Sequence, residues 1–479
     1  MSFSLLDWII FVSVPLLAWL IGNSKRQTGS WRGYFLATGN LQTSAVAATY
    51  FGANLTFTAI FLILSEEGYK RGVWVFSVPI FWLLGTILFV VLYPRMKKFI
   101  SKGLTLHQTI GSVFDSSSLQ RWASLWTILA FVGTSALEFY GGIKLLKWAN
   151  LPLFVNVTIA LLLAFIVSAF TVRGGFRGVA FADIFLDVAA ALGAGILAYY
   201  YFHTPLAQLP PAEVHPPLHL PLFDNVLFVI GMGVIFLPFQ FCTLDSWQRL
   251  GAWYKRDKNP SSWLLSGSIV LSLVYCVPIL IGIFVRNSHF AVPEGSHPLK
   301  VFLDYMHILP GLLGLVFAGF IAAVFSTVDE LLNCSSLSLL FDVLQLKRID
   351  PDRNKDQEYK IVSSGKFYTS FFGFLAAIIA LLALAYERQI SDIAIAVFSG
   401  QVVFVVPLFY VLFKRNKAPR RAFSAKLAMI IAFFSSLLSV LLGWIFSEKS
   451  LIDAAPLLGL ILALISFIIS STTLRKENK

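Results

Sequence analysis

The sequence predicts an all-α polytopic membrane protein with about thirteen transmembrane helices, and three observations support this fold class. Hydrophobic residues make up 57% of the 479 positions and charged residues only 13%, whereas about a quarter of a soluble domain is charged. Thirteen apolar runs are long enough, at roughly 18 residues or more, to cross a bilayer as helices. Lys and Arg also gather on alternate loops between these runs.

The apolar runs follow one another along the whole chain with short connectors between them. The first contains Asp7 in its opening turn and no basic residue precedes it, so we expect a permanent span rather than a cleaved signal peptide. The ninth is too long for one span, so we expect its helix to continue beyond the membrane. The runs cover about 5–22, 41–65, 72–94, 119–143, 151–171, 178–202, 222–243, 262–285, 309–344, 368–386, 391–413, 424–447 and 453–473.

The basic residues predict the orientation of the chain. Assigning the loops alternately to two sides places 29 of the 37 Lys and Arg on one side and 8 on the other. Because cytoplasmic loops carry the excess of positive charge, we expect an outer N-terminus and a cytoplasmic C-terminus in the cell's inner or plasma membrane. This topology accounts for the net charge of +12, so no nucleic-acid partner is expected.

The connectors leave no room for a soluble domain. The longest are a proline-rich outer stretch, 203–221, and a charged inner stretch, 345–367. A chain of this kind is a carrier, a channel, an embedded enzyme or a sensor. No H-E-x-x-H motif occurs, no paired-Asp protease signature is apparent, and the seven His are scattered. The three Cys fall in or beside apolar runs, so no disulfide framework is expected. We therefore expect no enzyme.

Two of the predicted spans look broken near their middle. The second contains YFGANLTFTA (50–59) and the seventh contains VIGMGVIFLP (229–238), which are rich in Gly, Asn, Thr and Pro. They lie five spans apart, as two five-helix inverted repeats over spans two to eleven require. The alternative is close helix packing through small residues. The repeats divide the chain into an extra helix and inner loop (1–40), repeat one (41–202), the outer loop (203–221), repeat two (222–413) and two C-terminal helices with an inner tail (414–479).

The ninth span carries an unusual polar face within IAAVFSTVDELLNCSSLS (321–338). At 100° per residue, Ala323, Ser326, Thr327 and Glu330 share one face. Hydroxyl and carbonyl oxygens suit a hard monovalent cation such as sodium, and a broken helix supplies further carbonyls. The alternative is that the hydroxyls bond to their own helix. A carboxylate in the membrane costs roughly 2.5–3.5 kcal/mol unless it faces a partner or water, so Glu330 points to function.

These motifs resemble those of the sodium/solute symporter family. In this sequence the ninth span reads Ala323-Val-Phe-Ser326-Thr327, with Asn333, Ser335-Ser336 and Asp342 following. Four further stretches match family patterns in order. They are YFLATGNL (34–41) for Y-F-x-A-G-R, GANLT (52–56) for A-N-I-S, GGFRGVAFAD (174–183) for G-G-x-x-A-V-x-W-T-D, and QRLGAWYKRD (248–257) for Q-R-x-x-A-x-K.

The resemblance implies a leucine-transporter-like fold and a set of sodium ligands. By position, the ligands are the carbonyls of Gly52, Leu55 and Ala323 and the hydroxyls of Ser326 and Thr327. Asp183 matches an acidic residue that some members link to a further sodium position. The alternative for Asp183 is an acid at a helix start that reaches towards Arg173 and Arg177.

The chain also departs from the family pattern. Ala182 and Leu186 replace Thr and Gln, an extra Asp187 follows, and Glu330 stands where Ser is usual. We expect Asp183 and Glu330 to bind a second cation or to relay sodium to the cytoplasm. The alternative is that Glu330 only forms a salt bridge with an inner Arg. Asp329, 100° away on the helix, is expected to pair with a base at the inner surface.

The solute is only broadly constrained by the sequence. Polar side chains expected near a central cavity are Thr56, Thr58, Glu138, Gln240 and Gln401, with helix–helix hydrogen bonds as the alternative for each. Phe236, Phe239 and Gln240 occupy positions where sugar carriers tend to show sugar contacts, which argues against a sugar. The leading prediction is sodium-coupled import of a small polar organic solute, such as an amino acid or carboxylate, by alternating access. The alternative is a membrane solute sensor with the same fold.

Overall fold

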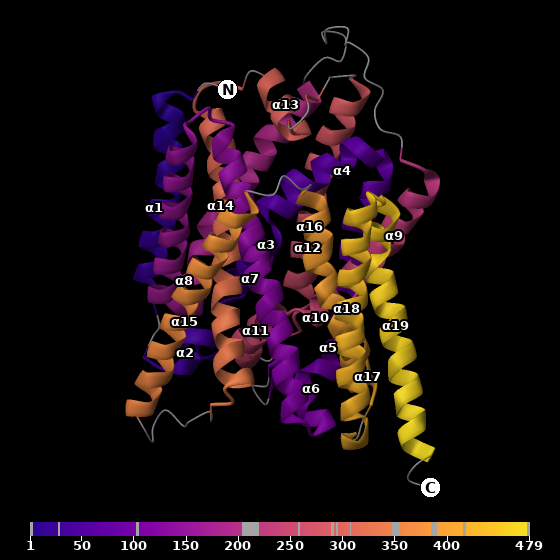
Figure 1. Ribbon diagram of the computed structural model, residues 1–479. Helices are drawn as coiled ribbons and strands as arrows, with labels where there is room; N and C mark the ends of the chain where they lie inside the picture. The colour runs from indigo at the N-terminus through magenta and orange to yellow at the C-terminus, as the bar shows by residue number, and fades with distance from the viewer. Residues whose placement is uncertain are drawn as a thin grey trace.

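The computed structural model describes residues 3–26, 29–101, 105–203, 220–256, 259–288, 292–293, 296–306, 308–346, 355–384, 390–414 and 418–476. Within these ranges every regular element is helical and no strand occurs. Most of the proline-rich outer stretch and part of the charged inner stretch lie outside the described residues. The helices run mostly along one direction and form a single bundle (Figure 1).

The helices have the following bounds. They are α1 (Leu5–Ser24), α2 (Trp31–Leu36), α3 (Thr43–Asn54), α4 (Leu64–Arg71), α5 (Ser77–Ile100), α6 (Leu106–Phe114), α7 (Ser117–Lys147), α8 (Leu153–His203), α9 (Leu222–Phe236), α10 (Phe239–Cys242), α11 (Leu244–Trp253), α12 (Ser261–Asn287), α13 (Pro298–Tyr305), α14 (Leu312–Ser338), α15 (Lys355–Ala383), α16 (Ile390–Ser399), α17 (Val405–Phe413), α18 (Ala422–Phe446) and α19 (Lys449–Lys476). Shorter helical turns include η2 (Phe57–Ile63), η3 (Gly72–Phe76), η6 (Leu339–Val343) and η7 (Gly400–Phe404).

Ten helical stretches of the described chain are long and apolar enough to cross a membrane. Phe57–Ile100, with 44 residues, contains the third predicted run (72–94) and the end of the second (41–65), whereas Phe154–His203, with 50, contains most of the fifth and all of the sixth. The seventh run corresponds to the shorter apolar helix Leu222–Phe236. The prediction of an all-helical, highly apolar chain is therefore confirmed, and the number of crossings is considered below.

The interruption inside α8 separates the fifth and sixth predicted runs. Gly175 has φ 60° and ψ −173°, a backbone conformation that lies outside the helical region and that glycine adopts without steric cost. A Cβ atom at this position would lie 2.9 Å from the carbonyl oxygen of Tyr34. The close approach of α2 and the turn between the two halves of α8 both require a glycine here.

Helix α14 is the central helix of the bundle. In its membrane-length window 89% of the residues are buried, compared with 33–61% in the other candidate spans. It packs against α1, α3, α7, α8 and α15. Its first turn is held by Asp7 of α1, whose Oδ1 accepts hydrogen bonds of 2.7 Å from the backbone N–H groups of Gly311 and Gly314. A carboxylate suits this place because a helix N-terminus carries free N–H donors and positive charge.

Candidate functional site

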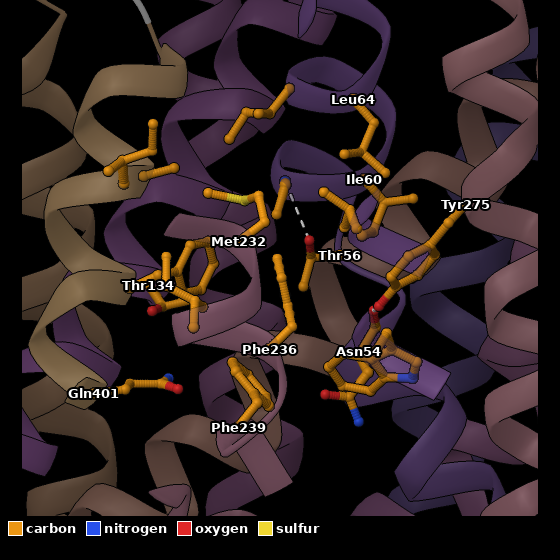
Figure 2. Close-up of a pocket in the computed structure, with 18 of the residues that line it drawn as sticks. Asn54, Thr56, Ile60, Leu64, Thr134, Met232, Phe236, Phe239, Tyr275 and Gln401 are labelled. Atoms are coloured by element: carbon orange, nitrogen blue, oxygen red, sulfur yellow. Dashed lines mark hydrogen bonds between the residues drawn. The ribbon is translucent and has the colours of Figure 1, made fainter. Parts of the chain in front are cut away.

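The predicted break in the second span is present. Helix α3 ends at Asn54, Leu55 has non-helical angles of φ −94° and ψ 66°, and the chain becomes helical again at Phe57. The freed backbone groups find side-chain partners, as apolar surroundings require. Thr56 Oγ1 accepts from the N–H of Ala59 at 3.1 Å (dashed in Figure 2), and Tyr275 donates its hydroxyl to the carbonyl of Asn54 at 2.7 Å.

Glu138 of α7 completes the first break. The backbone N–H of Thr58 donates to both carboxylate oxygens of Glu138 at 3.2 Å. The Thr58 hydroxyl donates in turn to the carbonyl of Leu137 at 3.1 Å. Two of the five residues predicted to contact solute therefore bind each other, and Glu138 caps the second half of the broken helix.

The predicted break in the seventh span is also present. Helix α9 ends at Phe236, α10 begins at Phe239 after Pro238, and Thr243 is extended with φ −104° and ψ 131° before α11. Proline lacks an N–H donor and cannot continue a helical hydrogen-bond ladder. The indole N–H of Trp247 donates to the carbonyl of Phe241 at 3.0 Å and so holds the irregular turn.

A cavity lies where the two breaks face each other. Its lining includes Asn54 and Thr56 from the first break and Phe236 and Phe239 from the second. Figure 2 shows these residues together with Gln401 from η7 around the cavity. Of the five predicted solute contacts, Thr56 and Gln401 line it, whereas Thr58, Glu138 and Gln240 are not lining residues. Gln240 instead accepts a 3.0 Å hydrogen bond from Ser246.

The predicted sodium ligands come together beside the first break. The Thr327 hydroxyl lies 3.0 Å from the carbonyl oxygen of Ala323 on its own helix and 3.5 Å from that of Gly52 on α3. Ser326 Oγ lies 3.5 Å from the carbonyl oxygen of Ala323. The N–H of Leu55 donates to the Gly52 carbonyl at 3.0 Å, so the fifth predicted ligand adjoins the same turn.

Asp187 reaches this same place and was not among the predicted sodium ligands. A Cβ atom on Gly52 would lie 2.6 Å from Asp187 Oδ1 and 3.1 Å from Ser326 Oγ. The absence of a side chain at Gly52 therefore leaves room between a carboxylate and a hydroxyl. The Oδ1 atom of Asp187 is buried and has no hydrogen-bond partner among the described residues. Its spacing of four from Asp183 on one helix was the available sequence signal.

Four acids form a group beside the predicted sodium ligands. We call this group the carboxylate cluster: Asp183, Asp187, Asp329 and Glu330. Each of the three aspartates lies within electrostatic reach of Glu330. Both oxygens of Asp183 and both of Asp329 lack a hydrogen-bond partner in the described part of the chain. The expectation that Asp329 pairs with a base at the inner surface is wrong within the described residues, because its side chain is fully buried and its oxygens contact no base among them.

Arg249 of α11 is the base that contacts this cluster. Its Nη2 atom lies 2.9 Å from Glu330 Oε2 and 2.7 Å from Asp245 Oδ2. Glu330 thus forms the salt bridge that the sequence left as an alternative, and its other oxygen has no hydrogen-bond partner in the described part of the chain. One guanidinium is therefore shared between two carboxyl groups.

The polar tail of α14 holds neighbouring helices. Asp342 accepts hydrogen bonds of 2.8 Å from the Thr105 hydroxyl and from a ring nitrogen of His107. Gln248 donates to Asn333 at 2.7 Å, and the Ser338 hydroxyl lies 2.7 Å from that of Ser124. Asn333, Ser338 and Asp342, beyond Glu330, are therefore engaged in helix–helix contacts.

The donor set fits a hard monovalent cation. Within the described ranges no group of three or more His, Cys, Asp or Glu is arranged to hold a metal ion. Carbonyl and hydroxyl oxygens with a nearby carboxylate are the donors that such a cation takes at broken membrane helices.

Comparisons with known proteins agree with this architecture. Residues 34–205 match the model of the Sodium:solute symporter family. The sodium/pantothenate symporter of Escherichia coli (strain K12) is 25% identical over 455 residues, which cover 86% of this chain and 88% of that protein. Over residues 34–205 the chain is therefore similar to the sodium:solute symporter family. The resemblance drawn from the sequence motifs is thus confirmed, as is the prediction of an integral membrane protein.

Two further sodium-coupled carriers match this chain over most of their length. The sodium/glucose cotransporter of Vibrio parahaemolyticus is 23% identical over 408 residues, covering 78% of this chain and 71% of that protein. A solved Na⁺-coupled sialic acid symporter, in a substrate-bound outward-open state, superimposes with a TM-score of 0.73 over 98% of both chains. At 16% identity this likeness shows the fold alone.

Proposed function

We propose that this protein is a secondary active symporter that imports a small organic solute together with sodium by alternating access. The observation that carries the proposal is the place of the cavity between two broken helices, with the predicted sodium ligands beside one of the breaks. Carriers built from inverted repeats bind solute and ion at such breaks. The inward movement of one charge supplies about 2.3 kcal/mol per 100 mV of membrane potential, which supports accumulation of solute.

Sodium in this proposal binds to the carbonyls of Gly52, Leu55 and Ala323 and the hydroxyls of Ser326 and Thr327. We add Asp187 to this set because its free Oδ1 faces the same space beside Gly52 as Ser326 Oγ. A carboxylate there offsets the charge of the ion. Position 52 needs a glycine for the same reason, since a methyl group there would fill the space.

Asp183 and Glu330 are proposed to take sodium onward, either as a second cation site or as a release relay. Asp183 is fully buried, and neither of its oxygens bonds to Arg173, Arg177 or any other described residue. An unpaired carboxylate in the membrane is costly, and a passing cation would offset that cost. Arg249 then serves to hold Glu330 in place.

The proposed topology has thirteen crossings, an outer N-terminus and a cytoplasmic C-terminus. Each of the two longest apolar stretches exceeds the roughly 20 residues that one crossing needs, so each accounts for two crossings. Figure 1 places the N and C labels at opposite ends of the bundle, which supports an odd number. The repeats are proposed at 41–202 and 222–413, each beginning with a broken helix.

Uptake into proteoliposomes tests the proposed function. The purified protein is reconstituted, and accumulation of labelled pantothenate, glucose, sialic acid, amino acids and amines is measured with and without an inward sodium gradient. We expect at least one solute to accumulate above its external concentration only when the gradient is present. Solute binding without accumulation of any compound would favour the sensor alternative and contradict symport.

A further inference from the structure

We propose, on the basis of the proposed function, that the solute is an organic cation, with an amine or quaternary ammonium group on a compact apolar body. The amide donors that would bind an anion are occupied, the described lining of the cavity contains two acids and no Lys, Arg or His, and aromatic rings contribute to that lining. These three features are independent of one another.

The first feature is the state of the broken helix. The start of a half-helix offers free N–H groups and partial positive charge, which makes it a binding place for the carboxylate of a solute. Here the N–H of Thr58 donates to Glu138 and the N–H of Ala59 donates to Thr56. Glu138 is fully buried, and its carboxyl group occupies the Thr58 donor at this point. A solute carboxylate would have to displace these partners and approach Glu138.

The second feature is the charge of the lining. Among the described residues that line the cavity, Glu67 and Asp245 are acidic and none is Lys, Arg or His. Glu67 is paired with Arg71, which donates from Nε at 2.5 Å. Asp245 is 4% exposed, and only its Oδ2 contacts Arg249, so its Oδ1 is buried without a partner in the described structure.

The free oxygen of Asp245 is the acceptor assigned to the solute. Arg249 cannot neutralise Asp245 fully, because the same Nη2 atom also contacts Glu330. A buried carboxylate oxygen without a hydrogen bond is costly. An ammonium group supplies both the missing donor and the missing positive charge, whereas a hydroxyl group supplies only the donor.

The third feature is the aromatic lining. The ring centroid of Trp82 lies 5.2 Å from that of Phe239 and 6.1 Å from that of Phe236, and the two Phe centroids are 6.0 Å apart. Figure 2 shows Phe236 below Thr56 and Phe239 further down among the residues that line the cavity. Aromatic faces carry negative potential that attracts ammonium groups, and their surface also accommodates an apolar body.

Equilibrium binding to the purified full-length protein in sodium tests this inference. The probes form two sets that are matched in shape. The first set is 3-phenylpropylamine, 3-phenylpropanol and 3-phenylpropionate. The second is the quaternary ammonium ion (2-hydroxyethyl)trimethylammonium and its uncharged analogue 3,3-dimethylbutan-1-ol, in which carbon replaces the nitrogen. Thermal stabilisation and calorimetry report binding. We expect at least one cation to bind about tenfold or more tightly than its neutral analogue, with the carboxylate weakest. The inference is overturned if no cation binds more tightly than its neutral analogue, or if the carboxylate binds best.

Two variants assign the preference to the cavity. Asp245→Asn should reduce the preference for the amine over the alcohol to about twofold or less, whereas Ser391→Ala, in the same lining, should leave it unchanged. Phe239→Leu keeps this position apolar and leaves the Asp245–Arg249 pair unchanged. It should weaken quaternary ammonium binding about fivefold relative to the neutral analogue. An unchanged preference in Phe239→Leu contradicts the assignment even if Asp245→Asn does not fold. The binding assay needs no sodium gradient. A negative binding result for cations therefore contradicts this inference alone, whereas a lack of sodium-driven uptake contradicts the proposed function.

Discussion

Two buried charged regions of this protein have opposite character. The first, which we call the α4–α19 network, consists of Glu67, Arg71, Asp392, Lys449 and Asp453. Arg71 contacts Glu67 at 2.5 Å and Asp453 at 2.7 Å, and Lys449 contacts Asp392 directly and approaches Glu67 at 3.8 Å. Every acid in this network has a base beside it.

The carboxylate cluster differs because its acids outnumber its bases. Arg249 contacts Glu330, while the oxygens of Asp183 and Asp329 contact no partner among the described residues. Paired charges need no additional counter-ion, whereas unpaired buried carboxylates are stabilised when a cation binds to them reversibly. We therefore infer that the paired charges hold helices together, whereas the unpaired acids are suited to a cation.

The largest expected effect concerns the paired region. Arg71→Met leaves Glu67 and Asp453 without their main partner in a buried site, which typically costs about 3–5 kcal/mol. We expect a clear fall in the midpoint of thermal unfolding in detergent, followed by tryptophan fluorescence. Lys300→Met, which removes the exposed pair with Asp304, should change the midpoint little. Equal midpoints for both variants would show that the α4–α19 network does not hold the helices.

A smaller effect is expected at the predicted sodium ligands. Ser326→Ala and Thr327→Ala each remove one oxygen, and a loss of about 1 kcal/mol raises the sodium concentration for half-maximal binding or transport by about fivefold. Solute affinity at saturating sodium should change less. Ser335→Ala is the matched control, because that hydroxyl donates to Leu331 on its own helix. Unchanged sodium dependence in both variants would remove these hydroxyls from the ion site.

The two breaks were predictable because their residues carry the signal locally. Gly52 and Asn54 in the second span, and Pro238 in the seventh, disfavour a continuous helix whatever packs around them. The shared face of Ser326 and Thr327 likewise follows from helical geometry alone. These parts of the fold and site required no knowledge of the tertiary structure.

The partners of the acids were not predictable in the same way. Asp187 reaches the space beside Gly52 only because α8 packs against α3, and Arg249 and Glu330 are 81 residues apart in sequence. Glu138 was expected near the solute, yet it caps the start of a half-helix from a different element. Local periodicity indicates which face a residue occupies, but it does not identify the element that lies opposite.

The smallest expected effect concerns the release relay. Glu330→Gln keeps the shape of the side chain and removes its charge, so the protein should fold while sodium release slows or the number of ions per solute changes. Sodium efflux rates and the sodium-to-solute ratio in proteoliposomes measure this. Glu448→Gln changes an exposed glutamate and should leave both unaltered. If Glu330→Gln retains the rate and ratio of the unmodified protein, Glu330 is structural and the relay is wrong.

We propose that the unpaired acids, unlike the paired ones, bind a cation, and equilibrium binding of radioactive sodium measures this. Asp187→Asn should raise the sodium dissociation constant about tenfold, equivalent to about 1.4 kcal/mol of lost attraction. Asp392→Asn, which removes an acid paired with Lys449, should change it by about twofold or less. An unchanged constant in Asp187→Asn, or equal weakening in both variants, would contradict the account.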